Sequence, residues 1–250
     1  MRRGEAEGRA GKRADGSAKT REAKLAAVWS AERLDADGAP RRDPGSASFN
    51  AAIESIAGRD ADPDPAPFAQ RALREVERRG FQQAERRVAL GDGAAWIWNF
   101  ADEHLPGAVQ IVDLFHAKEH LFDAAKAIYG TTSDLADQWG RARRDELDRH
   151  GPGPVIDELR RHAGHCEAAR RELEYFTANR QRMDYPAFRK QGLCVTTGVV
   201  EGACKSVLGS RLKRGGMHWT VNGANAIIAF RCAIDSNRFD GYWKRRAAQS

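Results

Sequence analysis

"RVALGDGAAWIWNFADEHLPGAVQIVDLFHAKEHLFDAAKAIYG", residues 87–130, is the stretch that decides the fold. Two short apolar runs, 87–90 and 108–112, are each followed by a segment with helical spacing of its apolar residues. Gly-Asp-Gly ends the first run, Pro-Gly closes the first helix, and a glycine ends the second helix. Such strand–helix–strand–helix order with short connections is typical of parallel strands joined by a crossover helix, so the sequence predicts an α/β fold.

Asp92 and Asp113 each stand directly after one of the predicted strands. Because parallel strands end at the same edge of a sheet, we expect both carboxylates at that edge, where α/β folds place their sites. His116 and His120 follow one helical turn apart, a spacing that would allow zinc binding. No acid stands between them as in a His-Glu-x-x-His motif. We therefore favour a role for His116 in ordering Asp113 or contacting a substrate phosphate.

The rest of the chain supplies further elements. We expect a strand at 24–31, a helix at 67–81 stopped by a glycine, charged helices between 131 and 185, and a helix at 221–236. The strand needs a partner, either later in the chain or before its first residue. Trp96 is expected in the core, although a tryptophan there would also be able to stack on a flipped base. The run HAGHC, 162–166, has no second cluster to complete a metal site and is expected on a solvated helix face.

Glu201 is the only carboxylate in residues 196–220, which are otherwise basic or neutral. On a helix from 199 to 213, it falls beside Leu208 and Leu212, at the border of the apolar arc, which predicts a half-buried carboxylate near the helix N-terminus. The simpler interpretation is an exposed i,i+4 pair with Lys205. The sharper hypothesis brings Glu201 to Asp92, where converging carboxylates would bind hard divalent cations.

Charge and composition set wider bounds. The 250 residues include 41 Lys and Arg against 35 Asp and Glu, a net charge of +6 that permits a polyanionic partner without demanding one. No apolar run reaches the roughly 20 residues that a membrane span needs, and no apolar stretch follows the basic N-terminus as in a secretory signal. The four cysteines form no Cys-x-x-Cys pair, which argues against a zinc ribbon and fits a reducing cytoplasm.

Two long motifs, LGDGAAWIWNFADEHLPGAVQIVDLFHAKEHL and GVVEGACKSVLGSRLKRGGMHW, resemble those of DDE-type transposases of bacterial insertion sequences, in the Kra-type branch of the mutator-like class. The resemblance extends to GSAKTREAKLAAVW, AIES and FDGYW. It implies an RNase H-like mixed sheet flanked by helices, with a helical insertion before the last catalytic acid. It also implies cleavage and strand transfer of DNA with Mg²⁺ or Mn²⁺, a homo-oligomer on element-end and target DNA, and a cytoplasmic, nucleoid-associated location.

The same resemblance assigns site residues. Asp92 matches the second acid of the triad and Glu201 the third, both as metal ligands. Asp113 and His116 match the Asp-x-x-His signature. The expected DNA contacts are Lys205, Arg211, Lys213 and Arg214. For the last three, the simpler interpretation is that their charges suit the C-terminal end of a helix. The implied parts are an N-terminal strand and turn region at 1–45, core segments at 46–130 and 191–250, and the insertion at 131–190.

The family's first acid lies on a strand upstream of the segment KTRE…KL, and this chain begins past that point. Asp15 lies in the following turn and does not match. The hypothesis is therefore an N-terminally truncated transposase that holds two of three acids, unless Asp113 completes the triad. The alternative is a non-catalytic fragment that binds DNA or an intact transposase.

Overall fold

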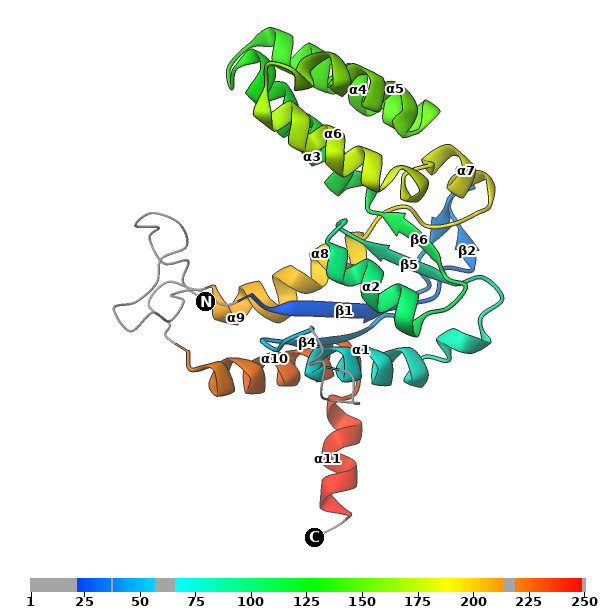
Figure 1. Ribbon diagram of the computed structural model, residues 1–250. Coiled ribbons are helices and arrows are strands. Elements are labelled where there is room, and N and C mark those ends of the chain that lie inside the picture. The colour runs from blue at the N-terminus through cyan, green and yellow to red at the C-terminus, as the bar shows by residue number, and fades with distance from the viewer. Residues whose placement is uncertain (1–21, 37, 57–65, 214–218, 249–250) are drawn as a thin grey trace. The chain divides into compact units, whose positions relative to one another are not determined.

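The computed structural model describes residues 22–36, 38–56, 66–213 and 219–248 (Figure 1). The described chain is a mixed α/β protein in which helices predominate. It divides into two compact units. Unit 1 takes its described residues from the ranges 1–32, 42–84 and 198–250, and unit 2 takes them from 33–41 and 85–197.

Unit 1 is built on an antiparallel pair of strands, β1 (Lys24–Val28) and β4 (Ser48–Ala52). The strand expected at 24–31 therefore forms, and its partner lies later in the chain. The truncation hypothesis implied that this strand lacks its partner, and that implication is wrong, because SFNAA forms the partner strand. Four of the five β4 residues are buried, so this short, small-residue strand is covered on both faces and lacks the alternating pattern of a surface strand.

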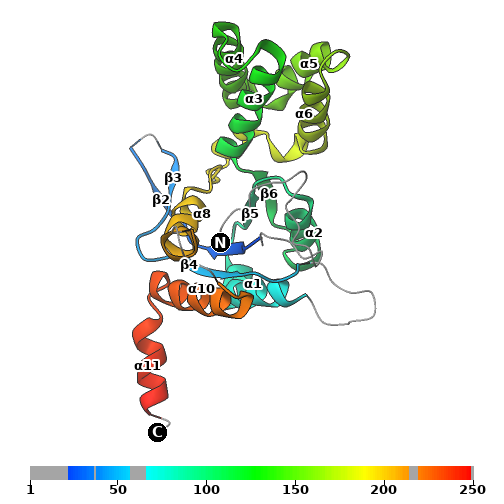
Figure 2. The same ribbon diagram turned by 90° about the vertical axis from the view of Figure 1, so that its left-hand side faces the viewer.

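The helices of unit 1 cover this strand pair. They are α1 (Pro67–Arg78), α8 (Gly198–Ala203), the π-helical segment η3 (Cys204–Gly209), α9 (Ser210–Leu212), α10 (Val221–Asp235) and α11 (Phe239–Ala247). Both α1 and α10 pack on β4, while α8 contacts β1. α11 follows α10 and extends away from it (Figure 2). Helix α1 confirms the prediction at 67–81, and Gly80, with a φ of 64°, lies where it stops.

A fully buried carboxylate ties the parts of unit 1 together. Glu75 of α1 has no exposed side-chain surface and lies 2.7 and 2.9 Å from Arg238 Nη1 through its two oxygens. Arg78 approaches the same carboxylate at 2.7 Å. The second terminal nitrogen of Arg238 donates to the Phe49 carbonyl of β4 at 3.0 Å. One ion-pair network thus fastens α1, β4 and the turn before α11.

Unit 2 contains the strand–helix–strand–helix segment as predicted. Strands β5 (Val88–Gly91) and β6 (Val109–Val112) pair in parallel, connected by α2 (Ala95–His104), and α3 (Leu114–Tyr129) follows. A short hairpin, β2 (Arg33–Leu34) and β3 (Pro40–Arg41), belongs to the same unit. The expected single mixed sheet is not seen, since the described residues form three separate two-stranded sheets. Trp98, rather than the predicted Trp96, is the buried tryptophan of α2.

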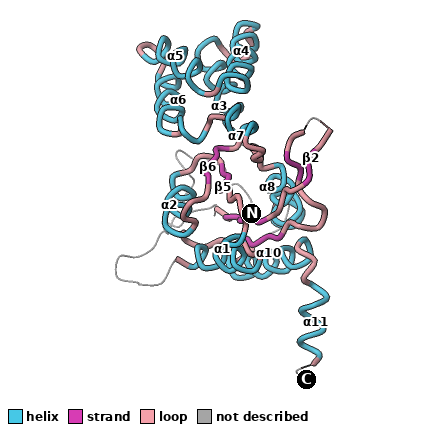
Figure 3. Tube along the Cα trace, turned by 90° about the vertical axis from the view of Figure 1, so that its right-hand side faces the viewer, coloured by secondary structure: helices cyan, strands magenta, loops and turns pink. Residues whose placement is uncertain are grey.

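Charged helices follow as expected between 131 and 190. They are α4 (Asp134–His150), α5 (Pro152–Ala163), α6 (Glu167–Ala178) and α7 (Tyr185–Lys190). Helix α3 packs on α4 and α6, and α5 packs on α4 and α6, so these four helices close into a bundle (Figure 3). Short 3₁₀ turns stand at Phe81–Gln83 and Arg180–Arg182. No helix in the described ranges combines the length and apolar character of a membrane span.

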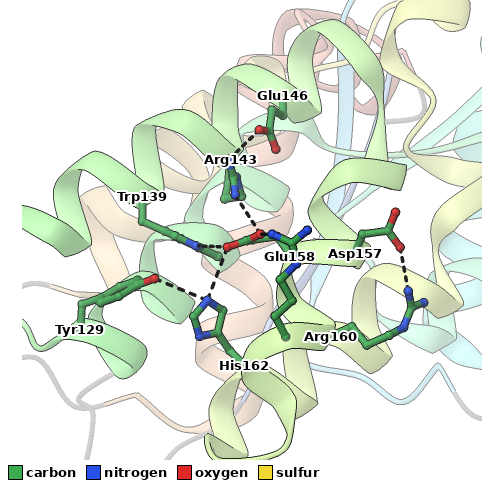
Figure 4. Close-up of polar contacts among 9 residues, drawn as sticks. Tyr129, Trp139, Arg143, Glu146, Asp157, Glu158, Arg160 and His162 are labelled. Carbon is green, nitrogen blue, oxygen red and sulfur yellow. Dashed lines mark hydrogen bonds and ion pairs between the residues drawn. The ribbon is translucent and has the colours of Figure 1, made fainter.

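A polar network inside this bundle corrects the expectation for His162 of the HAGHC run, whereas His165 of the same run is exposed as expected. Glu158 of α5 accepts from Trp139 Nε1 at 3.3 Å and lies 2.7 Å from Arg161 and 3.5 Å from both Arg143 and His162 (Figure 4). The His162 side chain is only 16% exposed, so it lies inside the bundle instead of on a solvated face. The pattern misled because α5 buries a polar stripe beside its apolar one.

Candidate functional site

Asp92 is presented at the carboxyl end of β5 by a tight turn. Its Oδ1 accepts a hydrogen bond from the Ala94 backbone nitrogen at 3.0 Å, which fixes the direction of the carboxylate. Gly93 has a φ of 96°, a conformation that side chains with a Cβ rarely adopt. The Asp92 residue is exposed. The turn therefore holds a solvent-facing carboxylate in one orientation.

Asp113 lies at the same edge, as the parallel-strand argument predicted, because its backbone nitrogen donates to the Gly91 carbonyl at 2.7 Å. Its side chain, however, is buried and hydrogen-bonded through both oxygens. Oδ1 caps α3 by accepting from the His116 backbone nitrogen at 2.8 Å. Oδ2 accepts from both the backbone nitrogen and the hydroxyl of Thr197, the latter at 2.8 Å. A metal ion would have to replace these bonds, so the carboxylate fits a helix cap better than a ligand.

A chain of side-chain contacts runs from His116 to α6. His116 Nε2 lies 3.3 Å from His120 Nε2, and His120 Nδ1 lies 2.7 Å from Glu172. These contacts connect α3 to α6 through the two imidazole rings. The His116 side chain does not order the Asp113 carboxylate as expected; only its backbone nitrogen bonds there. Its other ring nitrogen lies 3.5 Å from Glu119.

Tyr175 of α6 joins this chain to Asp92. Its ring stacks on His120 with centroids 4.0 Å apart and an interplanar angle of 16°. Its hydroxyl donates to the Asp92 carbonyl at 3.1 Å. Burial, and then the charges of Asp92, Glu172 and Asp113, raise the pKa of Tyr175 far above its usual value, so the hydroxyl remains a donor. Sequence inspection missed both Tyr175 and Glu172, since no local motif marks them.

Glu201 belongs to unit 1 and is not half-buried as predicted. Its side chain is 69% exposed and pairs with Lys205 at 2.7 Å, the simpler of the two interpretations. The hydrogen bond and charge of Lys205 lower the pKa of Glu201. The π-helical segment at 204–209 explains the error, because a π-turn holds more residues than an α-turn and shifts the phase of the helix. Ahead of it, Ala203 marks the buried face, and Glu201 points away from that face.

The expected DNA contacts lie at the end of the same helical stretch. Arg211 and Lys213 are exposed, and Lys205 is 77% exposed although it is paired. Arg214 lies outside the described residues. These side chains are accessible to a phosphate backbone, and their exposure equally suits the C-terminal helix end.

Metal binding has limited support in the side-chain arrangement. Within the described ranges, no three His, Cys, Asp or Glu side chains gather as a metal site requires. This includes His116, which bonds to His120, and His120, which also bonds to Glu172. Asp92 is an exposed oxygen donor of the type that Mg²⁺ prefers, and so is Glu201, each in its own unit. The chain matches no family model, curated protein or solved structure at a significant level.

Proposed function

We propose that this protein acts on DNA as a DDE-type transposase of a bacterial insertion sequence, by metal-dependent cleavage and strand transfer. The observation that carries the proposal is the β5–β6 edge. There, an exposed and oriented carboxylate, Asp92, follows a parallel strand, in the motif that resembles the second acid of this family.

Asp92 of unit 2 and Glu201 of unit 1 are each proposed as a ligand of Mg²⁺ or Mn²⁺, as the resemblance implies. Such an ion, when bound, would activate a water or 3′-hydroxyl and stabilise a leaving oxygen. The chain's own contribution is to orient the Asp92 carboxylate through Ala94 and to release Glu201 from a solvent-exposed pair, which costs little. Asp113 keeps the turn at the second strand end in place, and the His116 ring, 37% exposed, is accessible to a phosphate oxygen.

The proposed partner is DNA at the element ends and at the target. The proposed phosphate contacts are Lys205, Arg211, Lys213 and Arg214. Such cationic contacts attract and position DNA without reading its sequence. A homo-oligomer on DNA and a place near the nucleoid belong to the same proposal.

A second candidate is a non-catalytic protein that binds DNA or an intact transposase. It is favoured by the lack of a three-residue metal group within the described part of the chain, and by the occupied oxygens of Asp113. The two candidates share DNA binding and differ in chemistry.

One experiment separates them. Supercoiled plasmid carrying the DNA that flanks the gene is incubated with the protein in Mg²⁺, Mn²⁺ or EDTA, and nicking is followed on gels. The catalytic proposal expects nicking with either metal, loss of nicking in Asp92→Asn and Glu201→Gln, and full activity in the exposed control Glu174→Gln. DNA binding without nicking would favour the second candidate. The absence of both DNA binding and nicking would refute both candidates.

A further inference from the structure

We propose that Tyr175 of α6 is a positioning residue for the Asp92 carboxylate, and that Glu172 and His120 hold Tyr175 in place. The inference rests on the proposed function only in treating Asp92 as the reacting carboxylate. It gives the bundle helix α6 a part in the site, because α6 supplies both Tyr175 and Glu172.

The first step is the contact between Tyr175 and the turn. The hydroxyl donates to the Asp92 carbonyl at 3.1 Å, and the phenol lies directly against Gly93. A Cβ added at Gly93 would come within 2.6 Å of the Tyr175 hydroxyl oxygen and 2.7 Å of a ring carbon. No side chain fits between them. The phenol therefore covers the backbone that sets the direction of the Asp92 side chain.

The second step is the support behind Tyr175. The nearly parallel stack on His120 limits ring rotation from one side. His120 is itself fixed by the 2.7 Å bond from Nδ1 to Glu172, whose side chain is 18% exposed. Glu172 and Tyr175 stand three residues apart on α6, so both act from one helix face. The Tyr175 ring is thus supported by His120 on one face, and His120 is supported in turn by Glu172.

The third step links this support to the carboxylate. Asp92 is bonded twice in the turn, with its carbonyl accepting from Tyr175 and its Oδ1 accepting from the Ala94 nitrogen. Loss of the first bond lets the Asp92–Gly93 peptide rotate, which weakens the second. Outer groups that orient ligand side chains commonly change metal affinity about 10- to 100-fold when they are mutated. Because Tyr175 acts through the backbone, we expect the lower end of that range.

The test uses Tyr175→Phe, which removes only the hydroxyl, and Glu174→Gln as a matched control on an exposed position of the same helix. Hydrogen exchange by mass spectrometry follows peptides that contain the Ala94 amide, with no metal present. We expect exchange of this amide to rise about five-fold in Tyr175→Phe, the equivalent of about 1 kcal/mol for one hydrogen bond, and to stay unchanged in the control. Unchanged exchange in Tyr175→Phe would overturn the proposal.

Mn²⁺ titration by calorimetry then asks whether positioning matters for the metal. We expect an about ten-fold higher Kd in Tyr175→Phe, at a melting temperature close to that of the unmutated protein. Mn²⁺ affinity that is insensitive to Tyr175 but lost in Asp92→Asn would refute the inference alone. Mn²⁺ affinity that is insensitive to Asp92 would refute the proposed function, while the exchange result would still decide on positioning. Should Tyr175→Phe fold poorly, Glu172→Gln gives the same test through His120.

Discussion

Asp113 and Asp92 follow neighbouring strands but should respond to mutation in opposite ways. Replacement of Asp113 by Ala removes the cap of α3 and two bonds from Thr197. A helix cap contributes about 1 kcal/mol, and each further bond to the carboxylate about 1 kcal/mol, which gives a loss of about 3 kcal/mol in the free energy of unfolding. Asp92→Ala removes one bond at an exposed position, worth about 0.5–1 kcal/mol.

Urea unfolding followed by far-ultraviolet circular dichroism measures this difference. With an m-value of about 2 kcal/mol/M, Asp113→Ala should lower the unfolding midpoint by about 1.5 M and Asp92→Ala by less than about 0.5 M. Thr197→Val, which replaces the hydroxyl by a methyl group and keeps the backbone bond to Asp113, should fall between them. Nicking activity should show the reverse order once each variant is compared at a temperature where it is folded. Equal stability of the two alanine variants would refute the assignment of Asp113 as a structural cap.

Three further predictions concern ionised side chains. Arg238→Met should destabilise unit 1 by about 2–3 kcal/mol in urea unfolding, because the buried Glu75 carboxylate keeps only Arg78 as a cationic partner and the Phe49 carbonyl loses its donor; a loss below about 1 kcal/mol would contradict this. Although burial alone would raise it, the bond from a tryptophan and nearby cations lower the pKa of Glu158 below its ordinary 4.5. The stabilisation that the ionised Glu158 gives the fold is therefore complete above about pH 4.5 and is lost as the pH falls through the lower pKa of the folded state. The melting temperature of Glu158→Gln should therefore change less between pH 6 and pH 3 than that of the unmutated protein; an equal change in both would contradict this. Lys205→Ala should leave the melting temperature unchanged, since its pair with a glutamate is exposed, yet weaken DNA binding measured by fluorescence anisotropy; a large drop in melting temperature would show that the pair is structural.

The β5–β6 edge could be predicted from the local sequence pattern alone. The residues that decide it are close in sequence, and Gly-Asp-Gly and Val-Asp mark both strand ends. Tyr175 was out of reach, because it lies 83 residues from Asp92 and nothing local distinguishes it from a core tyrosine. The exposure of Glu201 was missed for another reason. A helical wheel assumes one angle per residue, and the π-segment breaks that assumption between Glu201 and Leu208.

The interleaving of the two units has a consequence for how the chain folds. Unit 1 closes only when residues about 170 positions apart meet, as in the 2.7 Å bond from the Ile53 nitrogen to Asn225. Most of unit 2 is one continuous stretch of about 110 residues lying between those partners. Folding of that stretch first would shorten the loop that unit 1 must close, and non-local pairing is intrinsically slow. We therefore expect pulse-labelled hydrogen exchange to protect β5, β6 and the bundle before β4 and α10, with closure of unit 1 as the slow step.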